Sequence, residues 1–176
     1  MLKSIITDAD FFGGEPKILS DISRYGSRGI ILNDENMAGM ILTGPNGFYK
    51  LPGGGIDLGE RESDAFMRQV LEEIGYDCKI IAPLGIVEEH KSRSNFCHIS
   101  YAFIARIEGE CKKSQSDKKS DFSISWMSLR DAATVMDKSL EMCKEYSMRF
   151  MLKREKVILD YALEEIGKGN ISIDLL

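Results

Sequence analysis

Residues 50–77, KLPGGGIDLGERESDAFMRQVLEEIGYD, decide the fold because they join a glycine-rich loop to a helical repeat. Pro52 and the three glycines after it favour tight turns and a close approach of the backbone to a ligand. Five large apolar residues then recur at helical spacing and share one face: Phe66, Met67, Val70, Leu71 and Ile74. The stretch therefore predicts a loop followed by an amphipathic helix over residues 64–74, with Ser63 as its N-cap and Gly75 just beyond its end.

The opposite face of this helix is acidic. Glu72 and Glu73 are adjacent on it, and Glu60 lies in the preceding loop, from where it can fold back toward the same face. Carboxylates held this closely repel one another unless a cation lies among them, and hard oxygen ligands suit Mg2+ or Mn2+. The pattern is thus open to two interpretations, a metal site that accepts phosphate oxygens or an ordinary solvated helix face.

The spacing of the whole stretch resembles the signature of the Nudix hydrolases. In that family the run is Gly, five residues, Glu, seven residues and then Arg-Glu-U-x-Glu-Glu-x-Gly-U, where U is bulky and apolar. Gly54, Glu60 and residues 68–76 (RQVLEEIGY) match eight of the nine restricted positions. The ninth differs, because residue 69 is Gln where the family has Glu.

The resemblance implies a fold of the α/β (α+β) class, an α/β/α sandwich with a mixed central sheet and a metal-binding loop and helix. It also implies a hydrolase that uses Mg2+ or Mn2+ to cleave the pyrophosphate bond of a nucleoside diphosphate linked to another moiety. Carried over to this sequence, Glu72, Glu73 and the Gly54 carbonyl are metal ligands and Glu60 is an outer support of the metal site. Arg68, four residues before Glu72, pairs with a carboxylate and orients it.

Gln69 occupies the position at which the family has a metal ligand that in some members is also the catalytic base. An amide oxygen can coordinate metal or orient water, but it cannot take a proton, and general-base catalysis contributes roughly 10²–10⁴-fold. The nearest alternative bases in the sequence are Glu88, Glu89 and His90. Of these we predict Glu89 as the catalytic residue. The alternative function is a catalytically weakened Nudix-fold module that binds or senses a nucleotide.

Substrate contacts are expected from the strands that precede the glycine loop. Arg28 and Lys50 flank a predicted hairpin and are candidates for binding phosphate. Tyr25, Phe48 or Tyr49 could stack on a base, although aromatic residues beside turns more often anchor packing.

Composition bounds the remaining function classes. The chain has 176 residues, 43% hydrophobic and 29% charged, which suits one soluble domain over residues 1–176. A net charge of −5 argues against a nucleic-acid polymer as partner. No apolar run approaches the roughly 20 residues of a membrane span, so we expect a cytoplasmic protein with a small-molecule substrate and no membrane partner. The spacing of the four cysteines indicates neither a zinc site nor a disulfide framework, and a homodimer is left open.

The rest of the chain predicts an alternation of strands and helices. Strands are expected at residues 1–6, 17–19, 29–32, 37–43, 48–51, 78–82, 84–89, 96–107 and 122–127. Residues 91–95 are expected to form a loop, and the polar run 111–121 a hairpin loop. Helices are expected from residue 129 to about 136, capped by Ser128, and over residues 148–166, ended by Gly167 and Gly169.

Overall fold

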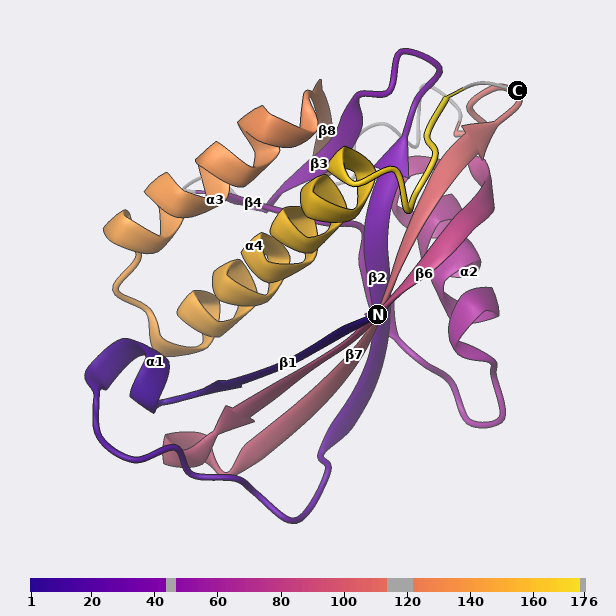
Figure 1. Cartoon of the computed structure of the whole chain (residues 1–176). Coiled ribbons are helices and arrows are strands. Elements are labelled where there is room, and N and C mark those ends of the chain that lie inside the picture. Colours follow the sequence, from indigo (N-terminus) through magenta and orange to yellow (C-terminus); the bar gives the residue numbers. More distant parts are fainter. Residues whose placement is uncertain (44–46, 114–121, 175–176) are drawn as a thin grey trace.

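A mixed β-sheet lies between two helical layers in the computed structural model, which describes residues 1–43, 47–113 and 122–174 (Figure 1). The sheet has the order β1-β6-β7-β2-β3-β4, with β5 on β2 and β8 on β3. The pairs β1/β6 and β2/β7 are parallel and the others are antiparallel. The strands are β1 Leu2–Thr7, β2 Arg24–Leu32, β3 Ala38–Thr43, β4 Phe48–Lys50, β5 Gly53–Gly55, β6 Asp77–Lys91, β7 Phe96–Glu108 and β8 Phe122–Met127. The predicted sandwich with a mixed sheet is confirmed.

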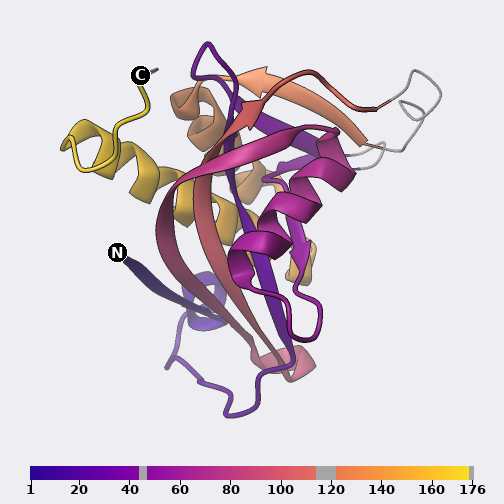
Figure 2. The ribbon, with the colours of Figure 1, turned by 90° about the vertical axis from the view of Figure 1, so that its right-hand side faces the viewer.

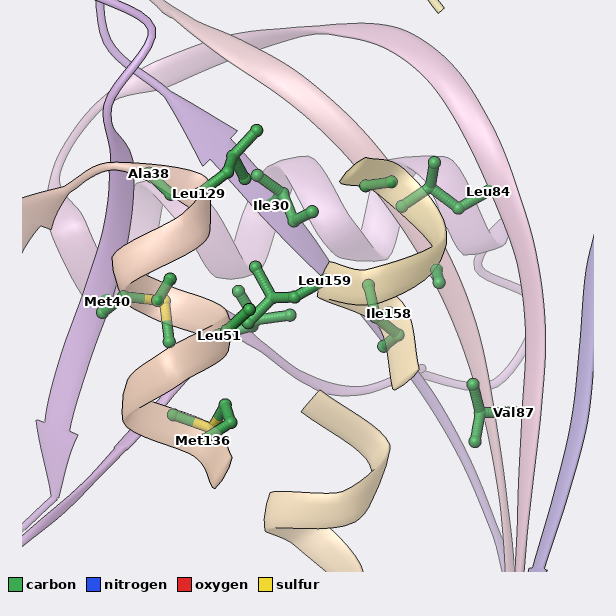
Figure 3. Close-up of a cluster of buried hydrophobic side chains, with 14 of the residues drawn as sticks. Ile30, Ala38, Met40, Leu51, Leu84, Val87, Leu129, Met136, Ile158 and Leu159 are labelled. Atoms are coloured by element: carbon green, nitrogen blue, oxygen red, sulfur yellow. The ribbon is translucent and has the colours of Figure 1, made fainter. Parts of the chain in front are cut away.

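The helices divide between the two faces of the sheet. Helix α2 (Glu62–Ile74) covers one face, and α3 (Leu129–Met142) and α4 (Tyr146–Gly167) cover the other (Figures 1 and 2). The alternation of side chains along β2 feeds both cores. Ile31 packs with Phe66 and Val70 of α2, whereas Ile30 belongs to the cluster formed with α3 and α4 (Figure 3).

Helix α2 starts earlier than its sequence predicts. Arg61 is the N-cap, with an extended backbone and no side-chain cap bond, so the prediction of Ser63 as cap was wrong. Glu62 and Asp64 lie in the first turn, where negative charge favours the positive end of the helix dipole. Gly75 ends the helix in the left-handed region with φ 81°, as predicted.

Two further segments differ from expectation. Residues 17–19 form no strand, and a short helix, α1 (Ala9–Phe12), lies before them. The two strands predicted on either side of Pro83 are one strand, β6, whose pairing with β7 shifts between Ile80 and Ala82 and again between Pro83 and Gly85. Such irregularities let a strand accommodate a proline that cannot donate to the ladder. The expected loop at 91–95 includes a 3-10 turn, Ser92–Ser94.

The C-terminal helices are longer than predicted. The Ser128 hydroxyl accepts the Asp131 N–H at 3.0 Å, which confirms the cap, but α3 continues to Met142. Of the predicted hairpin loop at 111–121, residues 114–121 lie outside the described residues. Within the described part of the chain, no helix is long and apolar enough to cross a membrane.

Candidate active site

The glycine loop lies directly against α2. Strand β5 pairs with β2, placing Gly54 opposite Ser27. Gly53 has φ 147°, and a Cβ there would come within 2.4 Å of the Ser27 carbonyl oxygen. A Cβ on Gly54 would lie 2.7 Å from the amide of Gln69. These glycines are therefore required for the backbone to pass between β2 and the helix.

Glu73 binds the loop with one carboxylate oxygen and a cation with the other. The Gly53 N–H donates to its Oε2 at 2.8 Å, and the Lys50 ammonium donates to its Oε1 at 2.5 Å. The side chains of Lys50 and Glu73 are only 14% and 15% exposed. This is an ion pair largely withdrawn from solvent, so the position of the carboxylate is well defined.

Arg68 organises the other signature carboxylates. It donates two hydrogen bonds to Glu60, from Nε to Oε1 and from NH2 to Oε2, both 2.8 Å long. It also donates to the Gly55 carbonyl at 3.2 Å and lies 3.4 Å from Glu72. A bidentate guanidinium fixes a carboxylate in direction as well as in charge. Arg68 thus has the orienting geometry expected of it, with Glu60 as its main partner.

The Glu60 carboxyl should titrate at an unusually low pH. Hydrogen bonds from Arg68, and then from the Asp57 N–H, lower its pKa from the ordinary 4.5 to about 2. Because the folded pKa is the lower one, the ionised group stabilises the fold above pH 4.5, and this contribution is lost as the pH falls through about 2. We expect Arg68→Met to raise the pKa toward 4.5 in an NMR titration of the side-chain carboxyl.

The control for this titration is Arg61→Met. Arg61 pairs with Asp64 on the exposed start of α2, so its removal should leave the pKa of Glu60 in place. An unchanged Glu60 pKa in Arg68→Met would contradict the assignment of Arg68 as its partner.

The signature carboxylates are divided between two cations. Over residues 1–43, 47–113 and 122–174, no three His, Cys, Asp or Glu side chains are grouped so that they could hold a metal ion. The expected convergence of Glu60, Glu72 and Glu73 is therefore not seen, because Arg68 holds Glu60 and Lys50 holds Glu73.

The donors beside the glycine loop nevertheless suit a hard divalent cation in their chemistry. Gln69 and Glu73 both reach the loop, and Glu72, whose side chain is 56% exposed, accepts from Arg68 at 3.4 Å one turn along the same helix. Together with the Gly54 carbonyl, these side chains offer two carboxylates and two neutral oxygens, which are the ligand types that Mg2+ and Mn2+ prefer. Residues and donor chemistry fit the metal, on the condition that Lys50 gives up its place on Glu73.

Arg28 lies in a different environment from Lys50. It is 5% exposed, donates to the Ser100 hydroxyl at 3.2 Å and lies 3.4 Å from Glu155 of α4. The structure therefore places Arg28 opposite Gly53 of the glycine loop, with its guanidinium on Glu155, whereas the Lys50 ammonium is on Glu73.

Glu89 lies beneath α4. It is fully buried, 2.7 Å from Arg154 and 3.2 Å from His98. Burial alone would raise its pKa, but the charge of Arg154, helped by His98 and Lys91, outweighs burial and holds the pKa well below the ordinary value. Within the described residues, Glu89 Oε1 and His98 Nε2 have no hydrogen-bond partner. A carboxylate that holds its proton so weakly is a poor general base.

The two other candidate bases form a pair on β6. Glu88 Oε2 lies 3.2 Å from His90 Nε2, while His90 Nδ1 accepts the Leu19 N–H at 3.1 Å. His90 is 2% exposed, so this imidazole joins β6 to the segment before β2.

Arg154 and Glu155 are structural residues that the sequence analysis missed. Glu155 Oε2 accepts the Leu51 N–H at 3.0 Å, and its Oε1 accepts Arg154. Helix α4 thereby holds the backbone one residue before Pro52 and the glycines. A signal was present, since Glu155 follows Met151 by four residues and precedes Ile158 by three, which places a charge on the apolar face.

The three aromatic residues considered for base stacking differ in how far they are packed into the fold. Phe48 and Tyr49 pack against the core formed with α3 and α4. Tyr25 is 44% exposed and stacks on Tyr101, with ring centroids 6.5 Å apart.

The fold and the loop–helix site define a protein of the mixed-sheet α/β/α sandwich class. The family model of the NUDIX domain matches residues 24–148, and the chain belongs to the Nudix hydrolase family. A Bacillus subtilis (strain 168) protein named "Putative 8-oxo-dGTP diphosphatase" is 27% identical over 99 residues. That match spans 56% of this chain and 62% of the relative's length.

Solved structures show the same fold. A NUDIX hydrolase from Nitrosomonas europaea aligns with a TM-score of 0.57 at 16% identity, covering 87% of this chain and 95% of that one. A UDP-X diphosphatase gives 0.55 at 12% identity, covering 88% and 66% of the two chains. A MutT protein from Methanosarcina mazei Go1 gives 0.54 at 20% identity, covering 84% and 99%.

Proposed function

We propose that the protein is a Mg2+- or Mn2+-dependent hydrolase that cleaves the pyrophosphate bond of a nucleoside diphosphate linked to another moiety. The observation on which this proposal rests is the contact of two signature side chains, Glu73 and Gln69, with the glycine loop. The chain that makes these contacts belongs to the Nudix family. This substrate class is supported by the names of the "Putative 8-oxo-dGTP diphosphatase" and the UDP-X diphosphatase, both of which refer to diphosphatases of nucleotides.

Each signature residue has a role in this proposal. Glu72, Glu73, Gln69 and the Gly54 carbonyl would hold the metal, while Arg68 keeps Glu60 in place as an outer support. A divalent ion bound there would neutralise phosphate charge and lower the pKa of the attacking water. The amide of Gln69 could orient that water but cannot take its proton, which would pass to solvent once the metal has lowered the pKa of the water.

The decisive assay is hydrolysis of nucleotide sugars, ADP-ribose, dinucleoside polyphosphates and oxidised nucleoside triphosphates with Mg2+ or Mn2+. We expect turnover that EDTA abolishes and that Glu72→Gln lowers by at least about 10–100-fold, the range seen when even outer supports of a metal are lost. Glu72 is suited to this test because its exposed side chain contributes little to folding. Glu164→Gln, in an exposed pair on α4, is the matched control. Turnover that survives both EDTA and Glu72→Gln would contradict the proposal.

A second candidate function is a Nudix-fold module that binds a nucleotide without cleaving it. The observation in its favour is Gln69, which removes a carboxylate from the signature. This function predicts saturable binding of a nucleoside diphosphate with no product in the same assays.

A further inference from the structure

The ion pair between Lys50 and Glu73 places a cation of the protein itself on a signature carboxylate. Both oxygens of Glu73 are engaged, Oε1 by the Lys50 ammonium at 2.5 Å and Oε2 by the Gly53 N–H at 2.8 Å. A divalent ion can use Oε1 fully only if the ammonium moves, because two cations on one oxygen repel each other.

The position of Lys50 is fixed by its neighbours along the chain. Lys50 ends β4, where it pairs with Ile41 of β3. The next residue, Leu51, donates its N–H to the buried Glu155 at 3.0 Å. The backbone on both sides of Lys50 is therefore held, and its ammonium is directed to Glu73 with 14% of the side chain exposed. An ordinary surface lysine has far more freedom than this.

Half of the acidic charge around the loop is offset by the protein's own cations without metal. Asp57, Glu60, Glu72 and Glu73 are opposed by Arg68 and Lys50, which leaves two net negative charges among these six side chains. Gln69 adds none. A divalent ion is attracted less strongly to this site than to four unpaired carboxylates, because Arg68 and Lys50 already offset half of the negative charge.

We propose that Lys50 is the internal counter-cation of Glu73 and moves to a substrate phosphate when a divalent ion takes Glu73. This inference deepens the proposed function and rests on it. Every charged group keeps a partner in this exchange. The Glu73 carboxylate would exchange the Lys50 ammonium for the divalent ion, and the ammonium would bind a phosphate oxygen. Metal and nucleotide binding are thereby coupled, and by linkage each strengthens the other to the same degree.

The test measures Mn2+ binding by electron paramagnetic resonance and calorimetry, with and without α,β-methylene-ADP. Without nucleotide, Lys50→Met should bind Mn2+ more tightly than the natural protein by about 5–150-fold, the usual range of coupling between sites. Adding nucleotide should raise the Mn2+ affinity of Lys50→Met by a smaller factor than it raises that of the natural protein. Lys50→Arg, which keeps the charge, should behave like the natural protein in both measurements.

The controls separate this inference from the proposed function. Lys168→Met removes an exposed pair with Glu164 at the far end of α4 and should not alter Mn2+ affinity. Circular dichroism establishes that each variant is folded, and Lys50→Gln replaces Lys50→Met where the latter is not. The role of Lys50 is overturned if the natural protein and the folded neutral variant bind Mn2+ equally tightly, or if nucleotide raises the Mn2+ affinity of both by the same factor. The proposed function is unaffected by either result. No Mn2+ uptake by either protein, even with nucleotide, overturns the proposed function and this inference together.

Discussion

Replacing Arg154 by methionine is expected to lower the free energy of unfolding by about 3–5 kcal/mol, the usual cost of removing one partner from a buried ion pair. Arg154 donates to Glu89 at 2.7 Å and to Glu155 at 2.6 Å, and both carboxylates are fully buried. Methionine fills much of the same volume but leaves two buried negative charges with Arg28 as the remaining guanidinium beside Glu155. Urea denaturation followed by circular dichroism measures the loss.

The matched control for Arg154→Met is Arg61→Met. Arg61 also pairs with a carboxylate, Asp64, but its side chain is 79% exposed, and solvent-exposed pairs of this kind contribute little to stability. A second variant, Arg154→Met with Glu89→Gln, should recover part of the lost stability because one uncompensated charge is gone. A loss below about 1 kcal/mol in Arg154→Met alone would contradict the ionised state that the lowered pKa of Glu89 implies.

The network that Arg154 completes also explains how α4 contributes to the site. Glu155 accepts a hydrogen bond from the Leu51 N–H, and Glu73 of α2 accepts one from the Gly53 N–H. The loop between these residues is therefore held from both helical layers at once. Its backbone is fixed before any ligand binds, which lowers the entropic cost of binding.

Local patterns in the sequence were sufficient to predict α2, the C′ glycine at Gly75 and the Ser128 cap. Each depends on residues within a few positions of one another, as the Ser128–Asp131 bond shows. The same local reasoning failed at Ser63, since several polar residues precede α2 and only the backbone shows that Arg61 is its N-cap.

The partners of the site residues could not be predicted in this way. Glu89 and Arg154 are 65 residues apart, and Leu51 and Glu155 are 104 apart. Their contacts depend on how β6 and α4 are placed in the finished fold. The signature spacing identified Glu73 as a candidate ligand, but it did not show that Lys50 is its partner.

Changing Gln69 to glutamate is expected to raise turnover by roughly 10²–10⁴-fold, the usual contribution of a general base. The amide of Gln69 lies 2.7 Å from the position that a Cβ of Gly54 would occupy, so the side chain already reaches the loop. Glutamate has the same shape as glutamine and places a carboxylate at that point. Steady-state hydrolysis measured across the pH range should show the gain, together with a new acidic limb where the added carboxyl protonates.

The added charge has a second effect that separates chemistry from binding. Gln69→Glu adds one negative charge to the site, and Mn2+ should bind more tightly even without nucleotide. Gln69→Leu, which has no side-chain oxygen, should lower turnover below that of the natural protein. A Gln69→Glu variant that binds Mn2+ more tightly but turns over no faster would show that the base comes from another element. Turnover appearing only in Gln69→Glu would instead identify the natural chain as the binding module.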